Sequence, residues 1–247
     1  MKTTLLISAL AVSLNACAID ADSATPETDD ETVEGSIRRL SANALMPSDL
    51  EPIPVGALTQ AYVNALAEDK ENRGALGYLV SCALPTGASI TAQYNCTVFG
   101  CTSTTYQGSI GLMSNWKTAV PTLDQQRKLS ACVLSRLNEF GRSLTISLRG
   151  AGYSMDPNEA STHVYKEGAF FGNVFAGADN YWGSCDADGP THPWRQCAQE
   201  GHCGIDWAGD CASACTADAN GNMTSCTGAN GVTYTQPTTV WLNAVTP

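Results

Sequence analysis

Cysteine usage is the feature that most constrains how this chain can fold. The sequence has 11 cysteines, an odd number, so at least one of them has no partner for an internal disulfide bond. Cys17 lies close to the N-terminus, far from the others along the chain. The remaining ten are Cys82, Cys96, Cys101, Cys132, Cys185, Cys197, Cys203, Cys211, Cys215 and Cys226. In an exported chain an even set of this size is typical of a disulfide framework, here of up to five bridges.

Residues 1–17 have the composition of an export signal. Lys2 supplies a positive charge, the apolar run LLISALAVSL follows, and small residues come next. The run is too short for a permanent membrane-spanning helix. The segment LNAC, which ends at Cys17, resembles a bacterial lipobox, in which the cysteine is lipidated and becomes the first residue of the mature chain. Alternatively, Ala16-Cys17-Ala18 fits an A-x-A cleavage site, and Cys17 then leaves with the signal.

Both ways of processing remove Cys17 from the fold and leave ten cysteines. We expect lipidation at Cys17, and therefore a cell-envelope protein whose partner is a membrane, reached through a lipid anchor. Ala18 and Ile19 stand behind Cys17, without the Asp associated with inner-membrane retention, so an outer-membrane lipoprotein is expected. The alternative location is secreted or periplasmic.

Acidic residues are concentrated just behind this signal. The chain has a formal net charge of -11, and residues 18–36 hold seven Asp or Glu and no Lys or Arg. With few bulky apolar side chains, this stretch cannot offset its chain entropy by burial, so residues 18–47 are predicted to be an acidic disordered tether. An acidic protein is poorly suited to phosphate backbones, and no nucleic-acid partner is expected.

Hydrophobic periodicity predicts the elements of the folded part. Residues 56–69 and 71–84 have helical spacing, and residues 121–141 are the clearest helix, with a capping box and a terminal glycine. Residues 88–112 are rich in Thr, Tyr, Val and Ile and predict short strands. Two further strands are expected at 143–150, where apolar and polar residues alternate, and at 163–177.

These elements predict an α+β fold, with helices packed on a small, mostly antiparallel sheet. Residues 48–178 would form the α+β body, and residues 179–247 a Cys-rich, loop-rich region that is stapled by disulfides and packed on the body. Cys82 and Cys132 each lie on the apolar face of a predicted helix, so the economical pairing joins them, whereas Cys96 and Cys101 are close enough to close a local loop. Ten cysteines allow many connectivities, so this pairing is a preference.

Several segments together carry a resemblance. The blocks LVSCALP (79–85), GSIGLMSNW (108–116), LSACVLSRLNEFG (129–141), SLRG (147–150) and EGAFFGNVF (167–175) precede a Cys-rich tail. In that order they resemble a group of uncharacterised exported proteins, many of them predicted lipoproteins, that are common among predatory gliding deltaproteobacteria. The resemblance covers roughly residues 76–226. It implies a shared location and fold, and it carries no activity and no catalytic residue.

Catalytic candidates are few. The chain has three histidines and no G-x-S-x-G nucleophile motif. Alternation along a strand would place His163, Tyr165 and Glu167 on one face, where His163 and Glu167 could form a hydrolytic site. A carboxylate pair drawn from Asp156, Glu159 and Glu167 could also serve glycoside cleavage. The alternative for these side chains is a solvated strand face.

No metal centre and no cofactor are expected. The cysteine spacings are irregular, and exported cysteines are more often bridged than metallated. The segments DADG (186–189) and DANGN (218–222) are similar to parts of calcium loops, but they lack the glycine and the closing glutamate of an EF-hand. We interpret both as turns, with weak calcium binding as the alternative.

A binding surface is suggested by three tryptophans around the run of cysteines from Cys185 to Cys226, namely Trp182, Trp194 and Trp207, because an indole ring can stack on a sugar or a partner protein. The alternative is that they form a small core over the disulfides. The favoured hypothesis is an exported bacterial lipoprotein that is non-catalytic and serves binding or structure at the surface or envelope, with a glycan or an envelope protein as its ligand. The alternatives are an extracytoplasmic hydrolase that uses the His/Glu site and a carbohydrate-binding module that uses the tryptophans.

Overall fold

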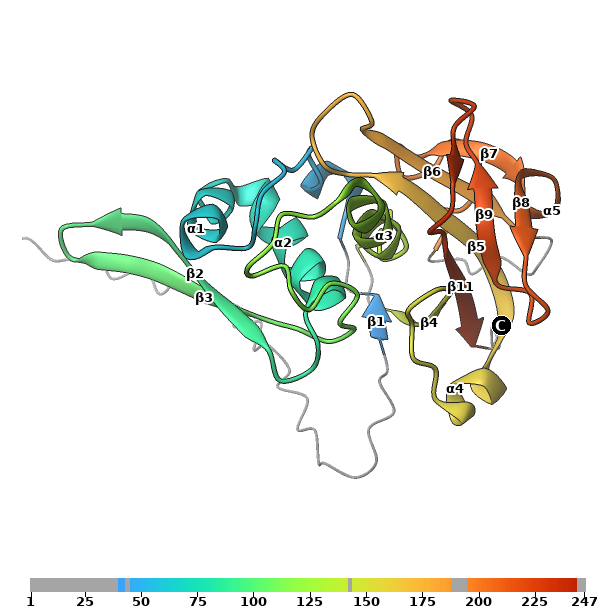
Figure 1. The fold of residues 1–247 in the computed structure, drawn as a ribbon, viewed down its shortest axis with the longest axis horizontal. Helices are drawn as coiled ribbons and strands as arrows, with labels where there is room; N and C mark the ends of the chain where they lie inside the picture. Colours follow the sequence, from blue (N-terminus) through green and yellow to red (C-terminus); the bar gives the residue numbers. More distant parts are fainter. Residues whose placement is uncertain (1–39, 43–44, 142–143, 188–194, 244–247) are drawn as a thin grey trace, which may run out of the picture. The chain divides into compact units, whose positions relative to one another are not determined.

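The computed structural model describes residues 40–42, 45–141, 144–187 and 195–243 (Figure 1). The predicted signal with Cys17 and most of the predicted tether lie outside these residues, as does Trp194. All the described residues belong to one compact unit. None of the helices they form is both long and apolar enough to cross a bilayer.

The three longest helices begin at polar caps that the sequence supplies. In α1 (Gln60–Glu68) the hydroxyl of Thr59 accepts a hydrogen bond from the amide of Tyr62. In α2 (Lys70–Ala83) the Asp69 carboxylate accepts hydrogen bonds from the amides of Glu71 and Asn72 in the first turn. α3 (Leu123–Leu134) begins with the predicted capping box of Thr122 and Gln125. The shorter helices are η1 (Pro47–Asp49), α4 (Pro157–Thr162) and α5 (Cys211–Ala214).

The helix predicted for residues 121–141 is too long at its C-terminal end. α3 stops at Leu134, and the Ser135 hydroxyl donates a hydrogen bond to the Cys132 carbonyl. Beyond it the chain extends: Leu137 forms a β-bridge with Leu45, and the Asn138 amide donates to the Leu45 carbonyl. Backbone pairing with a distant segment therefore replaces the last helical turns.

The main sheet has six strands in the order β1-β4-β11-β5-β6-β7. All neighbours are antiparallel except β6 and β7, which are parallel. The α+β prediction with a mostly antiparallel sheet is therefore confirmed. The strands are β1 (Leu40–Ala42), β4 (Leu144–Arg149), β5 (His163–Asn173), β6 (Tyr181–Asp186), β7 (Asp206–Asp210) and β11 (Thr238–Asn243).

The Cys-rich region contributes three of these six strands. β6 and β7 are the last two strands at one edge of the sheet, and β11, the last strand along the chain, lies between β4 and β5. The composition of this region predicts loops packed on the body. Its strands are short and its apolar residues few, so their pairing depends on partners far away in the sequence.

The two faces of the main sheet are covered differently. On one face α3 packs against a core that includes Leu148, Phe170 and Val240. On the other face a second core surrounds Phe171 and Tyr234 beneath a three-stranded sheet in the order β10-β9-β8. The strands of this smaller sheet are β8 (Cys215–Ala217), β9 (Met223–Thr227) and β10 (Thr233–Tyr234).

The strands predicted within residues 88–112 form one hairpin, β2 (Ser89–Thr97) and β3 (Gly100–Gln107). Hydrogen bonds fasten it to α1: Asn64 Oδ1 accepts from the Gln93 amide at 2.8 Å, Gln60 Nε2 donates to the Thr91 carbonyl at 2.7 Å, and the Glu68 carboxylate accepts from the Asn95 amide. Figure 1 shows the turn of this hairpin extending beyond α1 and α2.

All ten cysteines from Cys82 onward are bridged. The expected bonds Cys82–Cys132, between α2 and α3, and Cys96–Cys101, at the hairpin turn, are both present. The other bonds are Cys185–Cys211, Cys197–Cys203 and Cys215–Cys226. The predicted disulfide framework is therefore confirmed, with the maximum of five bridges that ten cysteines allow.

Candidate functional site

The carboxylate of Glu167 lies inside the protein. The guanidinium of Arg195, itself completely buried, donates from Nε to Glu167 Oε2 at 2.6 Å. Arg195 also donates to the carbonyls of Leu137 and Ser135, just beyond α3. Burial raises the pKa of the Glu167 carboxyl, while the adjacent guanidinium acts in the opposite direction. Through these contacts Arg195 connects the Cys-rich region to β5 and to the chain after α3. The ion pair therefore has a structural role.

His163, Tyr165 and Glu167 do not form one catalytic cluster. The register between β5 and β11 shifts twice, and the residues left out of the Cα pairing are Val164 and Glu167. Strict alternation, on which the predicted shared face depends, is therefore interrupted by bulges. His163 is buried, with Nδ1 3.0 Å from the Thr162 hydroxyl. Tyr165 lines a cavity whose lining includes neither His163 nor Glu167.

The other two carboxylates considered for glycoside cleavage belong to α4. Asp156 is its N-cap and accepts a hydrogen bond from the Asn158 amide at 2.7 Å, and Glu159 is buried in its first turn. The cap uses the Asp156 carboxylate to satisfy a helix donor. Neither carboxylate lines the cavity that Tyr165 borders.

Trp182 and Trp207, two of the tryptophans considered for binding, lie on strands. Trp182 belongs to β6 and packs against the main core, and Trp207 belongs to β7 and is half-buried. The indole nitrogens of both are buried. This placement favours the packing role over a sugar-stacking platform. Trp194 lies outside the described residues.

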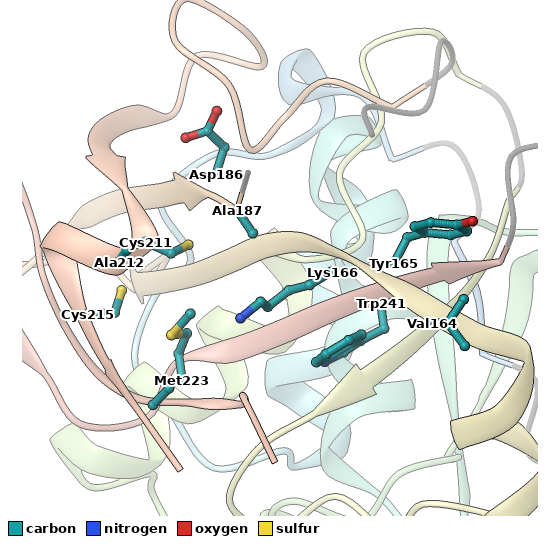
Figure 2. A pocket seen from close by; sticks show the side chains of 11 residues that line it. Val164, Tyr165, Lys166, Asp186, Ala187, Cys211, Ala212, Cys215, Met223 and Trp241 are labelled. Carbon is teal, nitrogen blue, oxygen red and sulfur yellow. The ribbon is translucent and has the colours of Figure 1, made fainter. Parts of the chain in front are cut away.

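A cavity of about 650 Å³ opens between β5, β11, α5 and the small sheet (Figure 2). Its lining includes Tyr165, Lys166, Asp186, Cys215 and Trp241. Lys166 and Asp186 are the charged residues among the described lining. In Figure 2 the Lys166 side chain points toward Met223 and the two lining cysteines.

Trp241 lines this cavity and is not among the candidate residues named from the sequence. The guanidinium carbon of Arg149 lies 4.5 Å from the centre of its ring, and Lys166 Nζ lies 5.7 Å away. Its indole N–H donates to Asn222 Oδ1 at 3.2 Å, and Lys166 donates to the Gly221 carbonyl, also at 3.2 Å. Alternation along Thr238–Asn243 could have indicated that Trp241 faces away from Val240 and Leu242. The two cations near the Trp241 ring and the indole N–H bond are all contacts within the protein. Together they join β11 to the loop before β9.

Two disulfides border the same cavity. Cys211 and Cys215, at either end of α5, both line it, and Cys215 Sγ lies 3.3 Å from Cys185 Sγ of the neighbouring bridge. The sulfurs of Cys185, Cys215 and Cys226 all lie within 4.8 Å of one another. Bridged sulfurs carry no thiolate charge, and thiolate is the form that binds metals. As bonded, this sulfur cluster therefore lacks the thiolates of a metal site, and exchange between its two bridges would first need one of these cysteines to be freed as a thiolate.

The hairpin turn is the most exposed apolar feature of the described structure. Val98 is 95% exposed and Phe99 is 97% exposed. The Cys96–Cys101 bond closes the loop that carries them. The composition of this stretch predicts strands with a local disulfide, and the two bulky apolar residues inside the disulfide-closed loop are a further signal, of an exposed tip.

The calcium-like segment 218–222 forms a turn whose carboxylate is already engaged. Asp218 Oδ1 accepts hydrogen bonds from the amides of Asn220 and Asn222, each at 2.9 Å. The Asn222 amide is the largest cause of the lowered pKa of this carboxyl. Segment 186–189 lies only partly within the described residues.

Comparisons with protein families, curated proteins and solved structures find no match for this chain. The resemblance to exported deltaproteobacterial proteins stays a prediction. The function is therefore inferred from the residues and their geometry.

Proposed function

We propose that this protein is an exported bacterial lipoprotein of the cell envelope, whose folded part serves binding or structure rather than catalysis. The observation that carries the proposal is that five disulfides join all ten cysteines from Cys82 to Cys226. A framework of this kind persists in oxidising compartments outside the cytoplasm. It also leaves Cys17, at the end of an export-type signal, as the one cysteine outside the framework.

The placement of the candidate catalytic groups supports a non-catalytic role. Glu167 is held by Arg195 inside the protein, and the cavity does not include His163. A hydrolytic site needs a base within reach of a nucleophile or a water, in a place that substrate can enter. A buried ion pair does not meet this requirement.

The finer proposal is attachment to the outer membrane through a lipid on Cys17. The residues behind Cys17 are Ala18 and Ile19, followed by an acidic stretch with no Lys or Arg up to Ser36. Like charges along such a stretch repel one another and favour extended conformations, which suits a spacer between membrane and domain.

The experiment is to purify the protein from an exporting bacterial host and measure the mass of its N-terminal peptide. A lipoprotein would begin at Cys17 and carry acyl chains, and the protein would fractionate with membranes. The variant Cys17→Ser should remove both properties, whereas Ser13→Ala, a matched change outside the LNAC segment, should remove neither. An unlipidated N-terminus that starts after Ala18 would refute the anchor and favour a secreted or periplasmic protein.

A further inference from the structure

The hairpin β2–β3 presents its turn on a stiff support. Its strands pair in register from Ser89 opposite Gln107 to Tyr94 opposite Thr102, and the Cys96–Cys101 bond closes the end. The support is fixed, since the hairpin packs on α1 and α2 through side chains such as Tyr94 and Tyr106. Val98 and Phe99 are therefore held in solvent by an ordered element.

Charge is absent from the whole hairpin. Residues 89–107 contain no Asp, Glu, Lys or Arg, in a chain whose net charge is -11. Charged groups of the described residues contact the hairpin behind its turn: Glu68 accepts a hydrogen bond from the Asn95 amide, and Arg73 lies 4.5 Å from the centre of the Tyr94 ring. Beyond Asn95, the turn can enter an apolar medium without burying a charge.

The size of the apolar tip separates two kinds of partner. A stable protein–protein interface buries about 800 Å² on each side, far more than two side chains offer. A bilayer contact needs no such area when a second attachment supplies the remaining affinity, as in proteins that combine a lipid chain with another membrane-binding element. Thr97, Asn95 and Thr102 next to the tip offer uncharged polar groups to the headgroup region.

The number of residues between Cys17 and the folded part sets how far an anchored domain can lie from the bilayer. Between Cys17 and Leu40, where β1 begins, the chain has a maximum length of about 75–80 Å. A lipid on Cys17 would keep the hairpin at a high effective concentration near the bilayer surface.

We propose that Val98 and Phe99 insert into the interfacial layer of the lipid bilayer and act as a second, non-covalent membrane contact that orients the anchored domain. This inference rests on the proposed lipid anchor. The depth of insertion ends near Asn95, where Glu68 approaches the hairpin.

The test uses the full chain, purified with its native N-terminus, in phosphatidylcholine vesicles whose acyl chains are brominated. Phe99→Trp places an indole at the tip, and bromine quenches indole only within the bilayer. We expect the emission of the new indole to shift to the blue and to lose intensity, after subtraction of the wild-type signal. Val98→Trp should behave alike, so the outcome does not depend on one variant folding. Ser103→Trp, exposed on the same hairpin but further from the tip, should show neither change.

Three outcomes would overturn the inference. Unquenched indoles at both 98 and 99 would show that the tip stays in water, and equal quenching at 103 would show that the hairpin lies flat rather than inserting its tip. Loss of quenching in high salt would indicate an electrostatic contact, which the uncharged hairpin cannot make. The N-terminal mass of the same sample reports lipidation separately, so failure of the tip contact is distinguishable from failure of the anchor.

Discussion

The sulfur atoms of Cys185 and Cys215 lie 3.3 Å apart although they belong to two different disulfides. One bridge joins β6 of the main sheet to the start of α5, and the other joins β8, which directly follows α5, to β9. A thiolate on Cys215 would therefore lie within reach of the Cys185–Cys211 bond.

We predict that Cys226→Ser leads to disulfide exchange. With Cys226 absent, the Cys215 thiolate attacks Cys185 Sγ, a Cys185–Cys215 bond forms, and Cys211 leaves as the thiolate. Alkylation in acid followed by peptide mass mapping should find two populations, one with free Cys215 and one with free Cys211.

The matched control for this exchange is Cys101→Ser, which frees Cys96 at the hairpin turn. This bridge lies at an exposed turn, and we expect Cys96 to be the single alkylated residue there. Finding free Cys215 as the sole product in Cys226→Ser would contradict the exchange.

The buried ion pair predicts a large effect for Glu167→Gln. The substitution leaves the completely buried Arg195 without its carboxylate, and breaking such a pair costs about 3–5 kcal/mol of unfolding free energy. Chemical denaturation of the oxidised protein measures this loss. Glu139→Gln, in the more exposed pair with His202, should cost no more than about 1 kcal/mol. Equal losses in the two variants would argue against a structural role for Glu167.

Acid should weaken the contact between Arg127 and Asp179. Arg127 donates two hydrogen bonds to this carboxylate, at 2.7 and 3.0 Å, and they hold its pKa below the usual range. A depressed folded-state pKa means that the stabilisation is complete above the unfolded pKa of about 3.9 and is lost as pH falls through the lower folded value. The difference in unfolding free energy between wild type and Asp179→Asn should be constant above about pH 5 and shrink below pH 4. A difference that grows on acidification would reverse the assigned sign.

The two bridges that the sequence predicted should differ in their contribution to stability. Cys82–Cys132 closes a loop with a sequence separation of 50, and Cys96–Cys101 closes one of 5. Loop-closure entropy assigns about 4 kcal/mol to the first and about 2 kcal/mol to the second. Removing each pair by double substitution to Ala and measuring urea unfolding tests the ranking. A larger loss for the hairpin bond would show that strain or residual structure outweighs chain entropy.

Features that depend on local sequence were predictable. The capping box of Thr122 and Gln125 and the start of α3 follow from residues within one turn of each other. The Cys82–Cys132 bond follows from the apolar faces of two helices, each readable from its own periodicity. The hairpin bond Cys96–Cys101 needs only five residues of separation.

Tertiary structure decided the rest. The position of β11 between β4 and β5, the early end of α3 at Leu134 and the bulge at Glu167 all depend on backbone pairing between distant segments. Glu167 was read as a candidate catalytic residue because no local pattern indicates that Arg195 would reach it inside the protein. The sequence alone determined the cysteine parity, the local elements and the uncharged hairpin. The pairing of strands far apart in the chain decided which polar side chains of the protein are buried and paired with one another. The physical reason is that hydrogen-bond register and burial arise only when those strands meet.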